Sequence, residues 1–170
     1  IADSNSTSCS NSGDNCWPLG VAWDSNNYIY YTSWQTKKVH KIDSGGAKVL
    51  DIGSGYGTGS GQMLAAYYLD IDSNGNIYVA DFYNHYVLKF NSSGSYVTRW
   101  GGYGSSNGQF LHPAGIAVDS NDNIFVSQPG GWSTYGHRVQ KFNSSLSFQV
   151  SIGGQGTSDG KFYYPYGITI

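Results

Sequence analysis

This 170-residue sequence has few charged residues, and neither positive nor negative charge prevails. Charged residues make up 12% of the chain, whereas globular proteins average about 25%, and nine Lys and Arg stand against eleven Asp and Glu. Such a balance gives no overall attraction to nucleic acid or to an anionic membrane surface. The sequence also lacks any apolar run near the roughly 20 residues of a membrane helix. We therefore expect no nucleic-acid partner and no membrane insertion of this segment.

Cysteine is scarce as well, and the two that occur stand close together as Cys9 and Cys16. The turn-rich loop between them can bring both thiols within disulfide distance, whereas its spacing suits neither a redox CxxC motif nor a zinc site. The alternative is a pair of free thiols in a flexible segment. Glycosylation acceptors begin at Asn5, Asn91 and Asn143. A disulfide and glycans together favour an extracellular or cell-surface location.

Helical periodicity with capping residues is absent, and in its place a repeat runs along the sequence. Asp24, Asp72 and Asp119 mark equivalent positions, 48 and 47 residues apart. Around each lie four short segments that are rich in β-branched or aromatic residues and bounded by Gly, Asn, Asp or Ser, which is typical of strands. The expected strands are 19–24, 28–31, 39–42 and 47–52; 67–72, 76–79, 87–90 and 96–100; and 114–119, 123–126, 139–142 and 148–152.

Four strands in such a period predict the blade of a β-propeller. We expect an all-β chain that forms one partial propeller, with repeats over 1–52, 53–100 and 101–152 and an incomplete repeat over 153–170. Within the last of these, 165–170 would be the first strand of a fourth blade. Because propellers close with about four to eight blades, three blades and a strand predict a segment of a larger ring. Two three-blade arcs that pair into one ring are the alternative.

The second and third repeats carry more specific motifs, namely Asn76-Ile-Tyr-Val-Ala-Asp81, Asn84-His-Tyr-Val87, Pro113-Ala-Gly-Ile-Ala-Val-Asp119 and His137-Arg-Val-Gln-Lys-Phe142. These motifs resemble the NHL repeat. The resemblance implies a propeller, usually of six blades, but no single activity, because the family includes lyases, RNA binders and extracellular sensor domains. The polar signature of the family is complete only in the second repeat. Ser33 and Gln128 stand where Asp81 does, and Lys37 stands where the family has His.

Strand direction alternates within a blade, so the connections fall into two groups at opposite ends. The loop after the second strand and the crossover to the next blade share one end, here called the loop end. The two hairpin turns share the other, the turn end. Aromatic residues in Gly-rich loops on a rigid face are suited to bind sugars, peptides or another protein. We predict a binding face at the loop end formed by Trp34, Tyr83, Tyr103, His112, Trp132 and Tyr135. The alternative is that individual rings only pack between blades.

The turn end carries Asn91 and Asn143 at equivalent positions, where glycans would leave the aromatic face free. As an alternative, both are simply good turn residues. The segments 72–76 and 119–123 predict hairpins, because Asn, Asp and Gly tolerate positive φ. The first resembles a calcium loop only superficially, since its Gly is at the fourth place and Tyr83 stands where the bidentate Glu belongs.

Catalytic chemistry has little support in the sequence. The stretch Gly104-Ser-Ser-Asn-Gly108 fits the G-x-S-x-G pattern but lacks its strand-to-helix context. His85 and His137 share a repeat position, which favours packing or hydrogen bonding over metal ligation. His112 is the one histidine that merits a test for a ligand role. We expect no catalytic residues, no metal and no cofactor.

These observations predict a non-enzymatic binding or assembly module that takes a protein or glycan ligand, or associates with itself. The alternative is an NHL-type metal-dependent lyase whose catalytic residues lie in further blades. The expected inner strands carry Asp24, Asp70, Asp72 and Asp119 but no His, which counts against the lyase.

Overall fold

The computed structural model describes residues 17–130 and 136–170, and every regular element in these ranges is a β-strand. No helix that could cross a membrane occurs among them. The strands form three four-stranded antiparallel sheets, each made of consecutive strands. Blade 1 contains β1 (Val21–Trp23), β2 (Ile29–Ser33), β3 (Lys38–Ile42) and β4 (Lys48–Ile52). Blade 2 contains β5 (Ala66–Ile71), β6 (Ile77–Asp81), β7 (Tyr86–Phe90) and β8 (Tyr96–Gly101). Blade 3 contains β9 (Ile116–Val118), β10 (Ile124–Gln128), β11 (Arg138–Phe142) and β12 (Phe148–Gly153).

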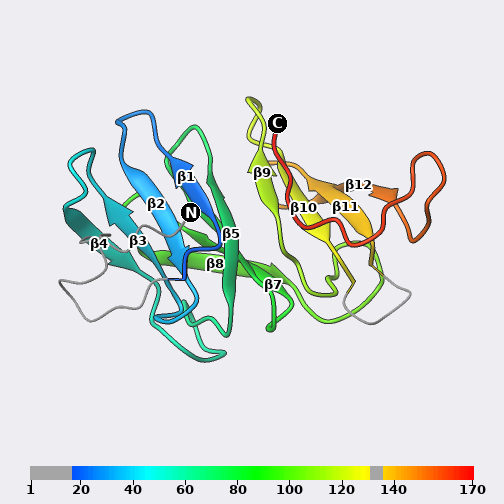
Figure 1. Ribbon diagram of the computed structural model, residues 1–170, viewed down its shortest axis with the longest axis horizontal. Helices are drawn as coiled ribbons and strands as arrows, with labels where there is room; N and C mark the ends of the chain where they lie inside the picture. The colour runs from blue at the N-terminus through cyan, green and yellow to red at the C-terminus, as the bar shows by residue number, and fades with distance from the viewer. Residues whose placement is uncertain (1–16, 131–135) are drawn as a thin grey trace.

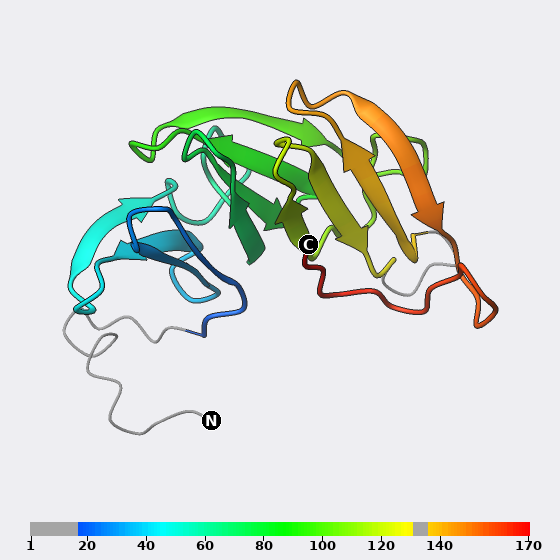
Figure 2. The same ribbon diagram turned by 90° about the horizontal axis from the view of Figure 1, so that it is seen from above.

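The three blades lie side by side along an arc (Figure 1). Seen from above, the first strand of each blade lies on the concave side of the arc and the fourth strand lies on the outside (Figure 2). The middle inner strand, β5, contacts both β1 and β9. This arrangement confirms the predicted all-β fold of four-stranded propeller blades.

Apolar side chains of both neighbouring blades fill each junction. The junction between blades 1 and 2 buries Ala22, Tyr30, Val39, Ile52, Leu69, Ile77, Val79, Leu88 and Phe90. The junction between blades 2 and 3 buries Tyr78, Ala80, Val87, Phe110, Ile116, Ile124, Val126 and Phe142. Because a fully buried Leu, Ile or Phe contributes about 1.5–3 kcal/mol, packing between blades holds the arc together and fixes the loops at its ends.

The first turn of each blade is closed by the aspartate that follows the inner strand. Oδ1 of Asp72 accepts hydrogen bonds from the backbone N–H of Asn74 at 3.0 Å and of Asn76 at 2.8 Å. Gly75 supplies the positive φ of 77° that this turn needs. Asp24 and Asp119 close the equivalent turns in the same way. The hairpins predicted at 72–76 and 119–123 are confirmed.

The crossovers between blades share one backbone arrangement. Each forms an isolated parallel bridge, as between Tyr103 and Phe110. Gly101, at the start of that crossover, has φ 106°, and a Cβ there would come within 2.2 Å of the Phe110 ring. Glycine is therefore required where the chain leaves β8 and turns toward blade 3.

Residues 165–170 form no strand, contrary to the prediction. Tyr166 nevertheless docks on blade 3 as Tyr67 docks on blade 1. The Ser127 hydroxyl donates to the Tyr166 carbonyl oxygen at 2.6 Å, and the Thr32 hydroxyl donates to the Tyr67 carbonyl oxygen. The inner strands β1, β5 and β9 each pair with the second strand of their own blade. The described residues offer 165–170 no such second strand.

Candidate functional site

The loop end of blades 1 and 2 carries a connected layer of aromatic rings. Trp34 follows β2 and Tyr83 follows β6, and their ring centroids lie 5.8 Å apart in an edge-to-face contact. His112, from the crossover to blade 3, lies 6.2 Å from Tyr83 and 4.6 Å from His85. Tyr103, from the same crossover, lies 5.0 Å from His85. The structure thus joins the four described members of the predicted face into one unit, here called the aromatic layer.

Three residues that were not predicted as members complete the aromatic layer: Tyr67, Phe82 and His85. Phe82 stacks on Tyr67 with centroids 4.3 Å apart and lies 4.7 Å from His112. Phe82 is buried, whereas Tyr83 is 50% and Tyr103 is 73% exposed. Tyr83 therefore packs on a buried ring, whereas Tyr103 packs on the half-buried His85. Phe82 could have been predicted as a member from its position next to Tyr83 in one loop. Tyr67 could not, because it resembles an ordinary strand residue.

His85 and His112 are joined by a hydrogen bond as well as by ring contact. The backbone N–H of His112 donates to Nδ1 of His85 at 3.1 Å, so neutral His85 carries its proton on Nε2. Nδ1 of His112 is buried and has no hydrogen-bond partner among the described residues. Burial, reinforced by the charge of His85, lowers the pKa of His112 to about 4. His112 is therefore neutral at pH 7.

The corresponding bond in blade 3 joins the N–H of Tyr164 to Nδ1 of His137, also at 3.1 Å. The shared position of His85 and His137 thus has the hydrogen-bonding role that the repeat predicted. In both cases the imidazole fastens the next crossover to the loop after the second strand.

A buried carboxylate fixes the loop beneath Tyr83. Asp81 is fully buried and accepts hydrogen bonds from the N–H of Leu64 at 3.1 Å and of Ala65 at 2.9 Å, and from Nδ2 of Asn84 at 2.6 Å. Burial raises the pKa of Asp81, although these hydrogen bonds oppose the rise. Asp81 therefore anchors the preceding crossover to blade 2 and holds the aromatic layer in place.

The ammonium group of Lys37 packs on the ring of Trp34. Nζ of Lys37 lies 3.7 Å from the centroid of the Trp34 ring, within the range of a cation–π contact. Burial lowers the pKa of Lys37, and the charge of Asp81 opposes that shift.

Five predicted site residues lie outside the described ranges. These are Trp132 and Tyr135 of the loop end, the acceptor Asn5, and the pair Cys9 and Cys16.

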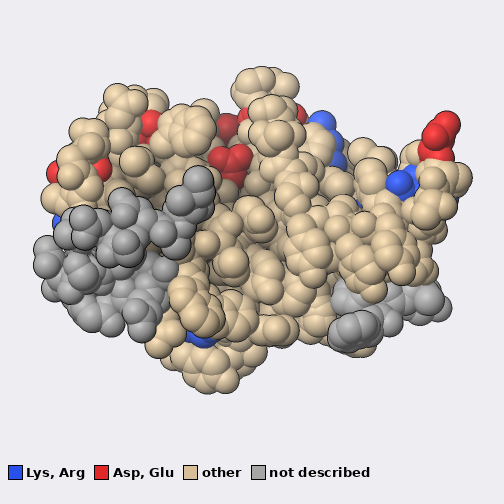
Figure 3. Space-filling view, viewed as in Figure 1, with Lys and Arg blue, Asp and Glu red and all other residues tan. Residues whose placement is uncertain are grey.

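The turn end differs in composition, because carboxylates and amides replace the rings. In Figure 3 the visible acidic side chains lie mainly in the upper half, over the turns that Figure 1 shows at the top of the arc. Burial tends to raise the pKa of Asp24, but hydrogen bonds from the Tyr28 N–H and the Tyr30 hydroxyl bring it below its usual value. The side-chain amide of Asn123 lowers the pKa of Asp119.

Asn91 and Asn143 also lie at the turn end, each at the start of a turn after the third strand. Oδ1 of Asn91 accepts from the N–H groups of Ser93 and Ser95, at 3.1 and 2.9 Å. Oδ1 of Asn143 makes the equivalent pair of bonds. The side-chain nitrogen, which would carry a glycan, has no partner at either site among the described residues.

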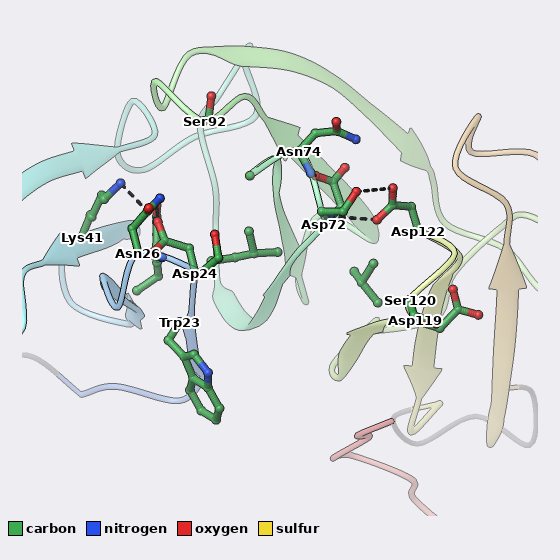
Figure 4. A pocket seen from close by; sticks show the side chains of 16 residues that line it. Trp23, Asp24, Asn26, Lys41, Asp72, Asn74, Ser92, Asp119, Ser120 and Asp122 are labelled. Carbon is green, nitrogen blue, oxygen red and sulfur yellow. Dashed lines mark hydrogen bonds and ion pairs between the residues drawn. The ribbon is translucent and has the colours of Figure 1, made fainter.

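A cavity of about 520 Å³ opens on the concave side of the turn end, between the first turns of the blades (Figure 4). We call it the turn-end groove. The last residues of the inner strands, Trp23, Ile71 and Val118, line it from equivalent positions. Trp23 is 72% exposed. The groove was not predicted, because an aromatic residue in an inner strand resembles a core residue.

Comparison with known families gives a match in the second blade. Residues 69–90 match the family model of the NHL repeat. This chain carries an NHL repeat. The matched NHL segment runs from β5 through β7 and includes Asp81 and His85, two residues that fasten the loop end. No curated protein sequence matches the chain.

Solved structures share the propeller fold. The chain is 18% identical to a streptogramin B lyase, with a TM-score of 0.66 over 92% of this chain and 45% of that one. It is 14% identical to a virginiamycin B lyase from Staphylococcus aureus, with a TM-score of 0.63 over 92% and 46%. It is 17% identical to a chain of a nidogen/laminin complex, with a TM-score of 0.65 over 90% and 52%. The chain thus spans about half the length of these propellers, and the likeness shows the fold alone.

The NHL signature varies among the blades, and the structure explains one variation. Gln128 of blade 3 occupies the position of Asp81 and accepts from Nε of Arg138 and Nε2 of Gln140, both at 2.8 Å. Arg138 and Gln140 in turn donate to the carbonyl oxygen of Gln109, at 3.0 and 2.7 Å. Three side chains thus anchor the crossover before blade 3, where blade 2 uses one carboxylate and Asn84.

Proposed function

We propose that this chain is part of a non-enzymatic, extracellular or cell-surface β-propeller that binds a protein or carbohydrate ligand through the aromatic layer. The observation that carries the proposal is the exposure of Tyr83 and Tyr103 on a fixed support. Phe82 is buried beside Tyr83, and Asp81 anchors the loop that carries Tyr83. Tyr103, in the following crossover, packs on His85, which bonds to His112. Exposed aromatic side chains that lose little freedom on binding are the usual anchors of protein interfaces.

A protein ligand is favoured at this end. The rings Trp34, Tyr83 and Tyr103 come from two loops and a crossover, so they spread over the edges of two blades instead of lining one narrow pocket. Trp, Tyr and His beside few charges match the centre of a protein interface. The nidogen/laminin complex offers a precedent, since a chain of similar fold belongs to a protein assembly there.

The extracellular location is supported by the glycosylation acceptors. Asn91 and Asn143 lie at the turn end, and their side-chain nitrogens are free of hydrogen bonds among the described residues. Glycans there would not cover the aromatic layer. Self-association through the same layer remains part of the proposal as one form of protein binding.

The lyase alternative has no specific observation in its favour. Asp24, Asp72 and Asp119 close the turns that follow them, and Oδ2 of Asp70 accepts from the N–H of Val118 at 2.7 Å. These carboxylates have structural roles, and the similarity to lyases is one of fold.

Selection of a displayed random-peptide library on the intact chain tests the proposal. Enriched peptides should bind wild type and Trp23→Ala alike, because Trp23 is an equally exposed ring at the opposite end. The same peptides should lose at least about tenfold in affinity for the double variant Tyr83→Ala/Tyr103→Ala. Two outcomes would contradict the proposed binding face. One is equal affinity of the selected peptides for both variants, and the other is that neither the peptide library nor an array of glycans yields a ligand.

A further inference from the structure

The crossover between β8 and β9 is held to blade 2 by an imidazole nitrogen. Nδ1 of His85 accepts the hydrogen bond from the His112 N–H at 3.1 Å, and the two rings lie 4.6 Å apart. We call this bond the His85 latch. The ring of His85 also contacts Tyr103, which lies in the same crossover at a centroid distance of 5.0 Å. One side chain therefore fixes the crossover and supports the most exposed ring of the aromatic layer.

Acid removes the acceptor on which the latch depends. Nδ1 can accept only while it carries no proton, and an unperturbed imidazole takes up its second proton at about pH 6.5. Once Nδ1 of His85 is protonated, it opposes the N–H of His112 with a second donor. Protonation therefore replaces a hydrogen bond with two donors that face each other.

No carboxylate among the described residues compensates a charge on this pair of histidines. The other rings in contact with the pair are the uncharged Phe82, Tyr83 and Tyr103. Burial lowers the pKa of His85, and burial together with the charge of His85 lowers the pKa of His112 to about 4. An open state, in which both rings reach water, therefore takes up protons more readily than the closed state does.

The charged side chains at the loop end have other partners. Lys37 contacts the Trp34 ring, Lys38 pairs with Asp51, Asp81 accepts from Leu64 and Ala65, Arg99 donates to Thr58, and Arg138 donates to Ser106 and Gln109. None of these contacts holds a charged His85 in the closed state.

The crossover between β4 and β5 is held by a carboxylate instead. Ala65, which occupies the place of His112 in that crossover, donates its N–H to Oδ1 of Asp81 at 2.9 Å. Lys37, in the place of His85, offers no acceptor. Burial raises the pKa of Asp81, but a protonated carboxyl group still has an acceptor oxygen. Mild acid should therefore leave this crossover in place.

Backbone conformation also favours opening of the His85 latch. His85 and His112 have φ of 60° and 55°, in the left-handed region that is costly for residues other than Gly, Asn and Asp, whereas Ala65 lies outside that region. The N–H of Gly102 donates to the His85 carbonyl oxygen at 2.8 Å, and this bond does not titrate. Acid should therefore loosen the crossover around His112 while its start stays on blade 2.

We propose that the His85 latch makes ligand binding at the aromatic layer acid-sensitive. Protonation of Nδ1 opens the latch, frees the crossover around His112 and removes the ring on which Tyr103 packs. The chain then holds its ligand at neutral pH and releases it in mild acid. This proposal rests on the function proposed for the aromatic layer and adds the regulation of that site.

Amide exchange measured by NMR on the isotope-labelled chain without ligand tests the latch itself. Between pH 7 and pH 5, the protection factor of the His112 N–H should fall by about tenfold, whereas that of the Ala65 N–H should stay constant. The side-chain nitrogen shifts of His85 should show a proton on Nε2 alone at pH 7 and a second proton on Nδ1 in acid. Parallel loss of protection at both amides, or a His85 that stays neutral down to pH 5, would overturn the proposal.

A selected peptide that contains no His, Asp or Glu tests the coupling to binding. Its affinity for wild type should be about threefold to tenfold weaker at pH 5 than at pH 7. His85→Asn places an acceptor that does not titrate near the position of Nδ1, and Asn tolerates positive φ. Relative to its own affinity at pH 7, this variant should lose most of the pH effect. His137→Asn, which changes the equivalent bond to Tyr164 in blade 3, is the matched control and should keep the wild-type ratio.

Two binding results would overturn the proposal. They are an equal ratio of affinities in wild type and His85→Asn, and a peptide affinity that stays constant while the latch opens. If no peptide is enriched, the proposed function fails and the coupling to a ligand fails with it. The ligand-free measurements then still confirm or refute the latch, so the two failures are distinguishable.

Discussion

The two ends of the arc are built from the same repeat but present different chemistry. At the loop end, a buried carboxylate and two histidines hold rings against one another, and the outermost rings face solvent. At the turn end, carboxylates near the surface close short turns and leave amides and one indole around a groove. The comparison shows that the repeat fixes backbone positions, whereas single residues such as Tyr103 decide which side chains each end exposes to solvent.

The largest difference between the ends should appear in stability. Asp81→Ala leaves the N–H groups of Leu64 and Ala65 buried without acceptors, so the free energy of unfolding should fall by about 2–4 kcal/mol. Asp43→Ala is the matched change at the turn end, where Oδ1 accepts from the N–H of Gly45 and of Ala47, both at 2.9 Å and exposed. It should cost about 1 kcal/mol or less. Urea denaturation measures the loss of free energy of unfolding in both variants. Equal losses would contradict the expected difference between the two ends.

The second largest difference between the two ends should appear in affinity for a ligand. Tyr103→Ala alone should lower affinity for a selected peptide by about threefold to tenfold, because the ring contacts His85 at one edge and is otherwise free to meet a ligand. Its thermal unfolding midpoint should hardly change. A drop in the midpoint with unchanged affinity would show that Tyr103 only packs against its neighbours.

At pH values above those at which the turn-end carboxylates Asp24 and Asp119 take up protons, the pH dependence of stability should come from the loop end. Because burial holds the pKa of His112 at about 4, below the value of about 6.5 in the unfolded chain, the unfolded state binds the proton more readily. The contribution of His112 is therefore intact above pH 6.5 and is lost as pH falls toward 4. Urea midpoints between pH 7 and 4 should decline less in His112→Phe, which keeps a ring there. An identical decline in wild type and variant would assign the effect to other groups.

The smallest effect concerns the glycan acceptors. Ser93→Ala removes the acceptor motif of Asn91 but keeps both backbone bonds to its Oδ1, so stability should change by about 0.5 kcal/mol or less. In material from a secretory host, intact mass should fall by one glycan relative to wild type. Asn91→Gln should lose the same glycan and also the turn bonds. An unmodified Asn91 in wild type would refute this part of the proposal.

Strands and turns could be predicted from the sequence because they depend on local rules. Short β-branched or aromatic segments and the recurring aspartates at 24, 72 and 119 identified all three blades to within a few residues. Residues 165–170 departed from the prediction, because strand assignment depends on a pairing partner, which sequence periodicity does not report.

The aromatic layer was predicted in part, because loop membership identified Trp34, Tyr83, Tyr103 and His112 but could not show which rings touch. Its role in binding stays a prediction. Phe82 and Tyr67 joined the aromatic layer through packing between blades, which no local pattern encodes. The groove around Trp23 depends on how three turns converge in space. The replacement of Asp81 by Gln128 in blade 3 became intelligible only when Arg138 and Gln140 were seen beside it.

Amide hydrogen exchange of the chain, alone and with a selected peptide, tests most directly the claim that the loop end is the protein-binding face. The account predicts slower exchange at 82–85 and 102–112 in the complex and no change at 24–28 and 72–76. Protection confined to the turn end, with the loop end unchanged, would contradict it.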